Sequence, residues 1–408
     1  MSRTLSVAAV VIAVCGFLPA QQFNVLYTFP KGWGPVSTLA FDKAGNLYGT
    51  TMAGGSTSCF GGLCGTVFEL SPNSNGTWTE TTLYSFTGAA SGYFPVAGLA
   101  IDSSGNLYGT TQQGGGGGCY PDGCGLAFEL SPPSVPGGNW NYTIIHTFCS
   151  APDCADGAIP RYGTLTFDGK GNLYGTTQAG GTGTGRGVDG DNGVVFELSP
   201  GIGGWTETVL YNFCSDVGQD YLCLDGNAPQ SGVTFDRAGN LYGTTLWGGR
   251  YATNYGLIFK LSPGLDGWTE TTLYAFPPSG IYGSNPMGPV AFDGAGNVYT
   301  TFSGEYGNGQ SGVGRMARGG RPSEIFLDGL VFGDIGVLID GKRRVLYGAT
   351  GANLYEIDQS GSLTVLYSFE PFVGATGSLI EDSSGNLYGP AYAGNDYNGN
   401  GEVFEYSP

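Results

Sequence analysis

Short runs of apolar, aromatic and branched residues alternate along this chain with clusters of Gly, Pro, Asn and Ser. One unit contains four such runs, at residues 96–101, 106–111, 125–130 and 139–148. Alternate positions of the fourth run carry ring or branched side chains, namely Trp140, Tyr142, Ile144 and His146. Runs of this length, bounded by turn formers, predict four antiparallel strands, here named A to D. Because no segment shows a helical period, we expect almost no helix.

The second run of each unit carries the motif Gly-Asn-Leu-Tyr-Gly. Five full copies lie at residues 45–49, 105–109, 171–175, 239–243 and 385–389. Two weaker copies, at residues 296–300 and 345–349, complete a series of seven. Such repetition indicates one supersecondary unit copied along the chain.

An aspartate stands three positions before the first glycine of the motif in six copies. These residues are Asp42, Asp102, Asp168, Asp236, Asp293 and Asp382. The carboxylate can accept hydrogen bonds from turn amides and the glycine can adopt positive φ, which predicts a tight A–B hairpin. A ring of aspartates also raises the idea of metal sites, but the turn explains why every one of these copies has a carboxylate.

Seven four-stranded units predict an all-β fold, a seven-bladed β-propeller with antiparallel blades. The ends of the chain support the count. Residues 23–29 resemble a D strand and residues 401–406 resemble a C strand. The N-terminal strand is therefore expected to close the last blade, which removes an exposed sheet edge. We expect residues 21–408 to form this single propeller domain.

Residues 1–20 have the pattern of a secretory signal peptide. Arg3 precedes an apolar run at residues 5–18, and Leu18-Pro19-Ala20 offers a cleavage site. Cys15 lacks the small residue that usually precedes a lipidated cysteine, so a lipoprotein is the less favoured alternative. No other segment is expected to span a membrane. The protein is predicted to be secreted, at the cell surface or in the periplasm.

The other eight cysteines form four local pairs. An even number and an export signal favour disulfides, here Cys59–Cys64, Cys119–Cys124, Cys149–Cys154 and Cys214–Cys223. Zinc is the alternative, but the spacing is unusual for a structural zinc site and His146 is the only histidine.

Glycine supplies 76 of the 408 residues, yet aromatic residues reach 13%, enough for a core. The net charge of −18 makes nucleic acid an unfavourable partner. We expect a monomer.

The consensus Gly-Asn-Leu-Tyr-Gly-Thr-Thr, Gly-x-Val-Phe-Glu-Leu-Ser-Pro and Gly-Trp-Thr-Glu-Thr-x-Leu-Tyr-x-Phe resembles the GloVer tandem-repeat family of exported bacterial proteins. The resemblance covers nearly the whole mature chain, and copies five and six depart from it at residues 312–317 and 340–344. It implies a secreted or surface repeat protein. It implies no established reaction and no catalytic residues.

In a propeller, the D–A and B–C loops emerge on one face, here called the loop face. All four cysteine pairs, the long insertions and many aromatic residues outside the consensus map to it. Binding usually involves such loops on a rigid scaffold. The candidate ligand-binding residues are Trp33, Trp247, Tyr251, Tyr282 and Tyr306. The first hypothesis is a non-catalytic protein that binds an extracellular glycan or a surface protein.

Catalysis is the second hypothesis. His146 replaces a consensus tyrosine on the outermost strand, where a Ser-His-Asp or Cys-His site is not expected. A glycoside hydrolase or polysaccharide lyase could still use carboxylates. The candidates are Glu305, Asp189, Asp191, Asp220 and Asp225. No cofactor is expected, with calcium held by Asp189 and Asp191 as the alternative. The third hypothesis is a structural or matrix scaffold.

Overall fold

The computed structural model describes residues 21–408 with several gaps. Residues 31–33, 57–58, 60–63, 117, 120–122, 136, 185–191, 250–254, 278–283, 304–311, 317–321, 327–336, 341–344, 350–352, 359, 361, 370–372 and 394–399 lie outside it. The expected signal peptide, residues 1–20, also lies outside the described part.

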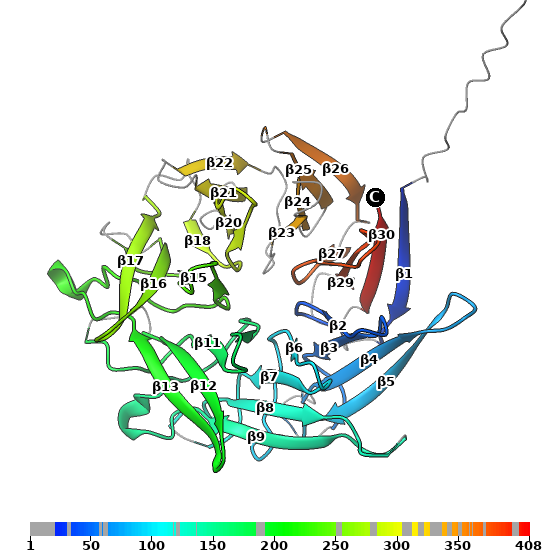
Figure 1. Ribbon diagram of the computed structural model, residues 1–408, viewed down its shortest axis with the longest axis horizontal. Helices are drawn as coiled ribbons and strands as arrows, with labels where there is room; N and C mark the ends of the chain where they lie inside the picture. Colours follow the sequence, from blue (N-terminus) through cyan, green and yellow to red (C-terminus); the bar gives the residue numbers. More distant parts are fainter. Residues whose placement is uncertain are drawn as a thin grey trace, which may run out of the picture.

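Seven antiparallel sheets stand around a common axis, as the sequence predicts, and form a seven-bladed β-propeller (Figure 1). Blade 1 contains β2 (Ala40–Phe41), β3 (Leu47–Thr51), β4 (Thr66–Pro72) and β5 (Trp78–Ser85). Blade 2 contains β6 (Ala100–Ile101), β7 (Leu107–Thr111), β8 (Leu126–Ser131) and β9 (Asn141–Thr147). Blade 3 contains β10 (Thr166–Phe167), β11 (Leu173–Thr177), β12 (Val194–Gly201) and β13 (Gly204–Asn212). Blade 4 contains β14 (Thr234–Phe235), β15 (Leu241–Thr245), β16 (Leu257–Gly264) and β17 (Gly267–Ala275).

The remaining blades keep the same order. Blade 5 contains β18 (Ser284–Pro286), β19 (Ala291–Phe292), β20 (Val298–Ser303), β21 (Gly312–Met316) and β22 (Pro322–Phe326). Blade 6 contains β23 (Val337–Asp340), β24 (Val345–Ala349), β25 (Asn353–Ile357) and β26 (Leu363–Ser368). Blade 7 contains β27 (Val373–Ala375), β28 (Ile380–Glu381), β29 (Leu387–Ala393), β30 (Gly401–Ser407) and β1 (Gln22–Thr28). Helix among the described residues is limited to two 3-10 turns, η2 (Pro152–Cys154) and η4 (Gln219–Tyr221).

The N-terminal strand closes the ring. β1 pairs antiparallel with β30, and Figure 1 shows the first and last strands side by side. Phe23 of β1 also stacks on Tyr367 of β26, with ring centroids 3.8 Å apart and planes 2° from parallel. The first strand therefore ties blade 7 to blade 6 as well as completing blade 7.

The A–B turn forms as its sequence predicts. Oδ1 of Asp42 accepts hydrogen bonds from the amides of Ala44 (2.8 Å) and Asn46 (2.9 Å), and Gly45 has φ of 91°. Oδ2 of Asp42 accepts a hydrogen bond from the hydroxyl of Tyr48 at 3.2 Å. Partial burial raises the pKa of Asp42, but these hydrogen bonds outweigh it and the net shift is downward. The turn aspartates are thus accounted for by hydrogen bonding within the hairpin.

The core lies mainly between neighbouring blades. At five blade junctions, a phenylalanine at the end of a D strand packs on the central phenylalanine of the next blade's C strand. The described pairs are Phe29–Phe68, Phe86–Phe128, Phe148–Phe196, Phe213–Phe259 and Phe369–Phe404. The second glycine of the repeat motif leaves room for that ring. A Cβ atom at Gly175 would lie 2.5 Å from Cζ of Phe196. The repeat motif therefore encodes a hairpin and the packing of neighbouring blades.

Candidate binding site at the channel mouth

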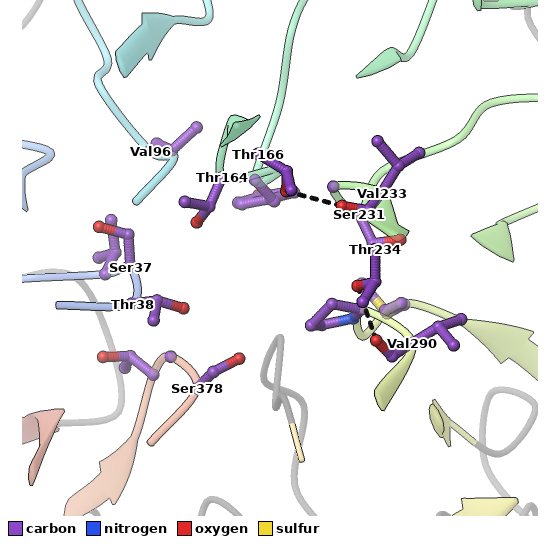
Figure 2. A pocket seen from close by; sticks show the side chains of 17 residues that line it. Ser37, Thr38, Val96, Thr164, Thr166, Ser231, Val233, Thr234, Val290 and Ser378 are labelled. Carbon is purple, nitrogen blue, oxygen red and sulfur yellow. Dashed lines mark hydrogen bonds between the residues drawn. The ribbon is translucent and has the colours of Figure 1, made fainter. Parts of the chain in front are cut away.

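The innermost strands surround a central channel that contains a cavity of about 230 Å³ (Figure 2). Its lining comes from the start of the A strands in blades 1, 2, 3, 4, 5 and 7. Eight serine and threonine residues take part: Ser37, Thr38, Thr164, Thr166, Ser231, Thr234, Thr376 and Ser378. The other lining residues are Tyr162 and small or apolar residues, so no charged side chain is among the lining residues that are described. The cavity is concave, neutral and rich in hydrogen-bonding groups.

Part of this hydroxyl ring links the blades. The hydroxyl of Thr166 donates to the carbonyl of Val233 at 2.7 Å, and the hydroxyl of Thr234 donates to the carbonyl of Val290 at the same distance (Figure 2). The hydroxyl of Thr376 donates to the carbonyl of Pro35 at 2.9 Å, across the junction of blades 7 and 1. These hydroxyls are structural.

Three further hydroxyls make no side-chain hydrogen bond within the described part of the chain. They belong to Thr38, Thr164 and Ser378, which line the cavity from blades 1, 3 and 7 (Figure 2). A hydroxyl can both donate and accept, so these groups can bind the hydroxyls of a ligand.

Blade 3 differs from the other blades at the mouth of the channel. In four blades, three residues lie between the proline before strand A and the first core residue: the pairs are Pro35/Leu39, Pro95/Leu99, Pro229/Val233 and Pro286/Val290. In blade 3 the corresponding residues are Pro160 and Leu165, so one residue is inserted. The inserted segment contains Arg161 and Tyr162, and Tyr162 adopts a left-handed conformation with φ of 56°. Left-handed backbone at a tyrosine is costly and points to a specialised local structure.

The guanidinium of Arg161 lies over Tyr162, with Cζ 4.6 Å from the ring centroid. Nη2 of Arg161 donates to the hydroxyl of Tyr162 at 2.8 Å, and Nη1 makes a longer contact of 3.4 Å to Oε1 of Gln178. Nε of Arg161 is buried without a hydrogen-bond partner. No carboxylate of the described residues forms an ion pair with Arg161. Because Gln178 follows β11, these contacts join the D–A and B–C loops of blade 3 on the loop face.

Sequence reasoning missed Arg161 and Tyr162. The signal that could have found them is the extra residue between Pro160 and Leu165, since no other blade with the proline has it.

Of the predicted aromatic binding residues, Trp247 alone is described. It is half-buried after β15, and its backbone pairs with that of the buried Asn227. The other four predicted residues lie outside the described residues: Trp33, Tyr251, Tyr282 and Tyr306.

Of the predicted carboxylates, Asp225 has its side chain described. It is 2% exposed, and its Oδ2 accepts hydrogen bonds from the amide of Ser215 (2.9 Å) and the hydroxyl of Tyr211 (2.7 Å). Burial raises its pKa. The two preceding D–A loops have equivalent caps. Oγ of Ser91 accepts a hydrogen bond from the amide of Thr87, and Oδ2 of Asp156 accepts one from the amide of Ser150. Loop capping thus explains the carboxylate of Asp225.

The remaining carboxylate candidates have no described side chain. Glu305, Asp189 and Asp191 lie outside the described residues, and Asp220 lies in η4 with only its backbone described. Calcium binding at Asp189 and Asp191 remains a prediction.

All four expected disulfides are formed, namely Cys59–Cys64, Cys119–Cys124, Cys149–Cys154 and Cys214–Cys223. Two of them lie side by side, because the sulfur atoms of Cys119, Cys124 and Cys149 are within 4.8 Å of one another. Four disulfides are typical of proteins that fold in an oxidising compartment. No helix in the described part of the chain is long and apolar enough to cross a membrane.

The fold and the loop face define a disulfide-bonded, seven-bladed β-propeller. A model of the Gloeobacter/Verrucomicrobia repeat matches residues 14–222 and, in an overlapping second match, residues 122–323. The chain belongs to this repeat family, in agreement with the resemblance of its motifs. No curated protein is significantly similar to it.

Several solved structures share the fold. One is an ulvan lyase of a new polysaccharide lyase family, with a TM-score of 0.58, 10% identity, and coverage of 94% of this chain and 95% of the lyase. The same enzyme bound to -[GlcA(1-4)Rha3S]- has a TM-score of 0.56 at the same identity and coverage. The extracellular domain of a hybrid two-component system from B. thetaiotaomicron has a TM-score of 0.52 and 11% identity, with coverage of 94% of this chain and 39% of that one. At these identities the likeness shows the fold alone.

Proposed function

We propose that this protein is a secreted, non-catalytic propeller that binds an extracellular glycan or another surface ligand through its loop face. The observation that carries the proposal is the channel mouth. There the blade-specific Tyr162 lines a neutral cavity that also presents the hydroxyls of Thr38, Thr164 and Ser378. The predicted signal peptide and the four disulfides are consistent with an extracellular location.

The composition of this site suits a sugar. An aromatic ring can cover the apolar face of a pyranose, and hydroxyls can exchange hydrogen bonds with its polar edge. A concave site that combines apolar side chains with convergent polar groups is typical of small-ligand sites. A cavity of about 230 Å³ suits a chain end or a branch rather than the middle of a polymer. Trp247 and Trp33 would then contact the part of the ligand outside the channel.

The test is a glycan array followed by titration calorimetry with the best ligand. We expect Tyr162→Ala to weaken binding at least about tenfold, which is the effect of losing roughly 1.4 kcal/mol of contact. Trp247→Ala and Trp33→Ala are expected to weaken binding with little change in Tm. Ile202→Ala is the control, because Ile202 is fully exposed in the C–D turn of blade 3 on the opposite face. Equal affinities for Tyr162→Ala, Ile202→Ala and the wild type would overturn the proposal.

A carbohydrate-active enzyme is the second candidate, supported by the similar fold of an ulvan lyase over 94% of this chain. The catalytic groups would be the carboxylates Glu305, Asp189, Asp191, Asp220 or Asp225. Release of reducing ends or unsaturated uronate from a polysaccharide panel, abolished by Asn or Gln at one of these positions, would establish it. Binding without turnover favours the first proposal. No binding to any glycan or surface protein favours a matrix scaffold.

A further inference from the structure

We propose that Arg161 forms a subsite for a carboxylate group, so that the glycan bound at the channel mouth is an acidic one that contains uronate. This inference rests on the proposed function and specifies the ligand class of the same site. Its basis is the guanidinium group of Arg161, which contacts Tyr162, one of the residues that line the neutral cavity.

Arg161 is a cation without an acidic partner among the described residues, in a chain with 33 acidic and 15 basic residues. An arginine placed there for stability would be expected to pair with one of those carboxylates. The groups that contact it are instead neutral, namely the hydroxyl of Tyr162 and the amide of Gln178. These contacts orient the guanidinium without neutralising its charge.

The guanidinium also retains hydrogen-bonding capacity. Nε is buried without a partner, and the contact of Nη1 to Gln178 is long at 3.4 Å. The Nε and Nη atoms of arginine form a planar fork that matches the two oxygens of a carboxylate. Because Nε is buried, a carboxylate would approach the guanidinium from its Nη side, where the contact to Gln178 is long.

Tyr162 connects this fork to the cavity. Tyr162 is one of the residues that line the cavity, and its hydroxyl accepts a hydrogen bond from Nη2 of Arg161 at 2.8 Å. A pyranose ring beside Tyr162 would therefore place a substituent such as a C6 carboxylate next to the guanidinium. The hydroxyls of Thr38, Thr164 and Ser378 would meet the remaining polar edge of the sugar.

The net charge of −18 does not exclude such a ligand. That charge is distributed over the surface, and its field is screened beyond about 8 Å at physiological ionic strength. The contact between guanidinium and carboxylate acts at about 2.8 Å, where screening is weak. The local geometry decides the preference, and the net charge affects mainly the rate of approach.

The test compares two ligands with the same backbone. Cellotetraose is neutral, and its C6-oxidised form is a tetramer of glucuronic acid. We expect the wild-type protein to bind the acidic tetramer at least about tenfold more tightly than cellotetraose, in line with the strength of charge-assisted hydrogen bonds. Arg161→Gln should remove this preference, so that the acidic tetramer and cellotetraose bind this variant with equal affinity. Arg161→Lys should restore the preference in part, since lysine keeps the charge but loses the fork.

Arg237→Gln is the matched control. Arg237 is exposed in an A–B turn on the opposite face, so this variant makes the same change in net charge without touching the site. A preference that survives Arg161→Gln, or that Arg237→Gln removes equally, would overturn the inference.

Other outcomes separate this inference from the proposed function. Equal binding of both tetramers, weakened by Tyr162→Ala, would overturn the acidic preference and leave glycan binding standing. Binding of a sulfated but uncarboxylated tetramer in place of the uronate would assign the subsite to sulfate esters. No binding of either tetramer, or of any uronate polysaccharide on the array, would overturn the carboxylate subsite.

Discussion

Nε2 of His146 lies 3.5 Å from Oδ2 of Asp156. The equivalent pair one blade further on is Tyr211 and Asp225, in which the tyrosine hydroxyl donates a hydrogen bond to the carboxylate at 2.7 Å. The histidine thus substitutes for a repeat tyrosine on the outermost strand, as its sequence position predicts. Burial lowers the pKa of His146, although Asp156 opposes this effect. Burial, together with repulsion from the carboxylate of Asp156, also raises the pKa of Glu207 in β13 to about 7.

Glu207 gives the protein a testable pH dependence. Its pKa in the folded state is raised above the ordinary 4.5, so the folded protein binds the proton more tightly than the unfolded chain. Stability therefore decreases as the pH rises from about 4.5 to about 7. Glu207→Gln should raise the free energy of unfolding by about 1–2 kcal/mol at pH 8 and by almost nothing at pH 4, because solvent screens part of the effect at this half-buried side chain.

Thermal unfolding of the variant and the wild type across this pH range is the measurement. Asp266→Asn serves as the control, since Asp266 is exposed in the C–D turn of blade 4. The lowered pKa of His146 acts in the opposite direction, because its contribution to stability is lost as the pH falls below about 6.5. A difference in Tm between Glu207→Gln and the wild type that does not change with pH would contradict the prediction.

Gly175 should be intolerant of even a methyl group. An alanine there would place Cβ 2.5 Å from Cζ of Phe196, and Leu165 closes the other side at 2.8 Å. Overpacking of this kind costs about 1–3 kcal/mol, which urea unfolding can measure. Gly169→Ala in the adjacent A–B turn is the control, because nothing lies within 4 Å of its Cβ position. Similar unfolding midpoints for the two variants would show that the repeat glycine is not a packing residue.

Closure of the ring should depend on Phe23. Truncation to alanine removes the stack on Tyr367 and the contact with Phe404, whose ring centroid lies 5.2 Å away. We expect Phe23→Ala to reduce stability by about 2–3 kcal/mol. Val25→Ala on the same strand is the comparison, because Val25 is 47% exposed and should change stability little. Hydrogen exchange of β30 should also accelerate in Phe23→Ala alone, and equal protection in both variants would argue against closure by this ring.

The two adjacent disulfides predict a specific exchange. In Cys154→Ala the freed thiolate of Cys149 would lie within 4.8 Å of both sulfur atoms of Cys119–Cys124. It can attack one of these sulfurs, form a new disulfide to it, and release the other cysteine as a thiolate. Peptide mapping without reduction should find Cys149 linked to Cys119 or Cys124 in part of the sample. In Cys223→Ala the thiol of Cys214 is outside this sulfur group, so Cys119–Cys124 should remain intact; exchange in both variants would mean that proximity is not the cause.

The sequence by itself determined what depends on residues close together in the chain. Asp42 and Gly45 define a hairpin within five residues, and the cysteine pairs are separated by at most nine positions. Repetition of this local information predicted the blades, their number and the closing strand. It also predicted that His146 lies on an outer strand.

Only the tertiary structure decided which residues meet at the channel. Thr38, Thr164 and Ser378 come from three blades, and they line one cavity because closure of the ring brings the A strands together. The partners of Arg161 likewise depend on how a D–A loop folds onto Gln178 in the B–C loop. Such contacts join positions that no local pattern relates, so the sequence alone did not single out these residues.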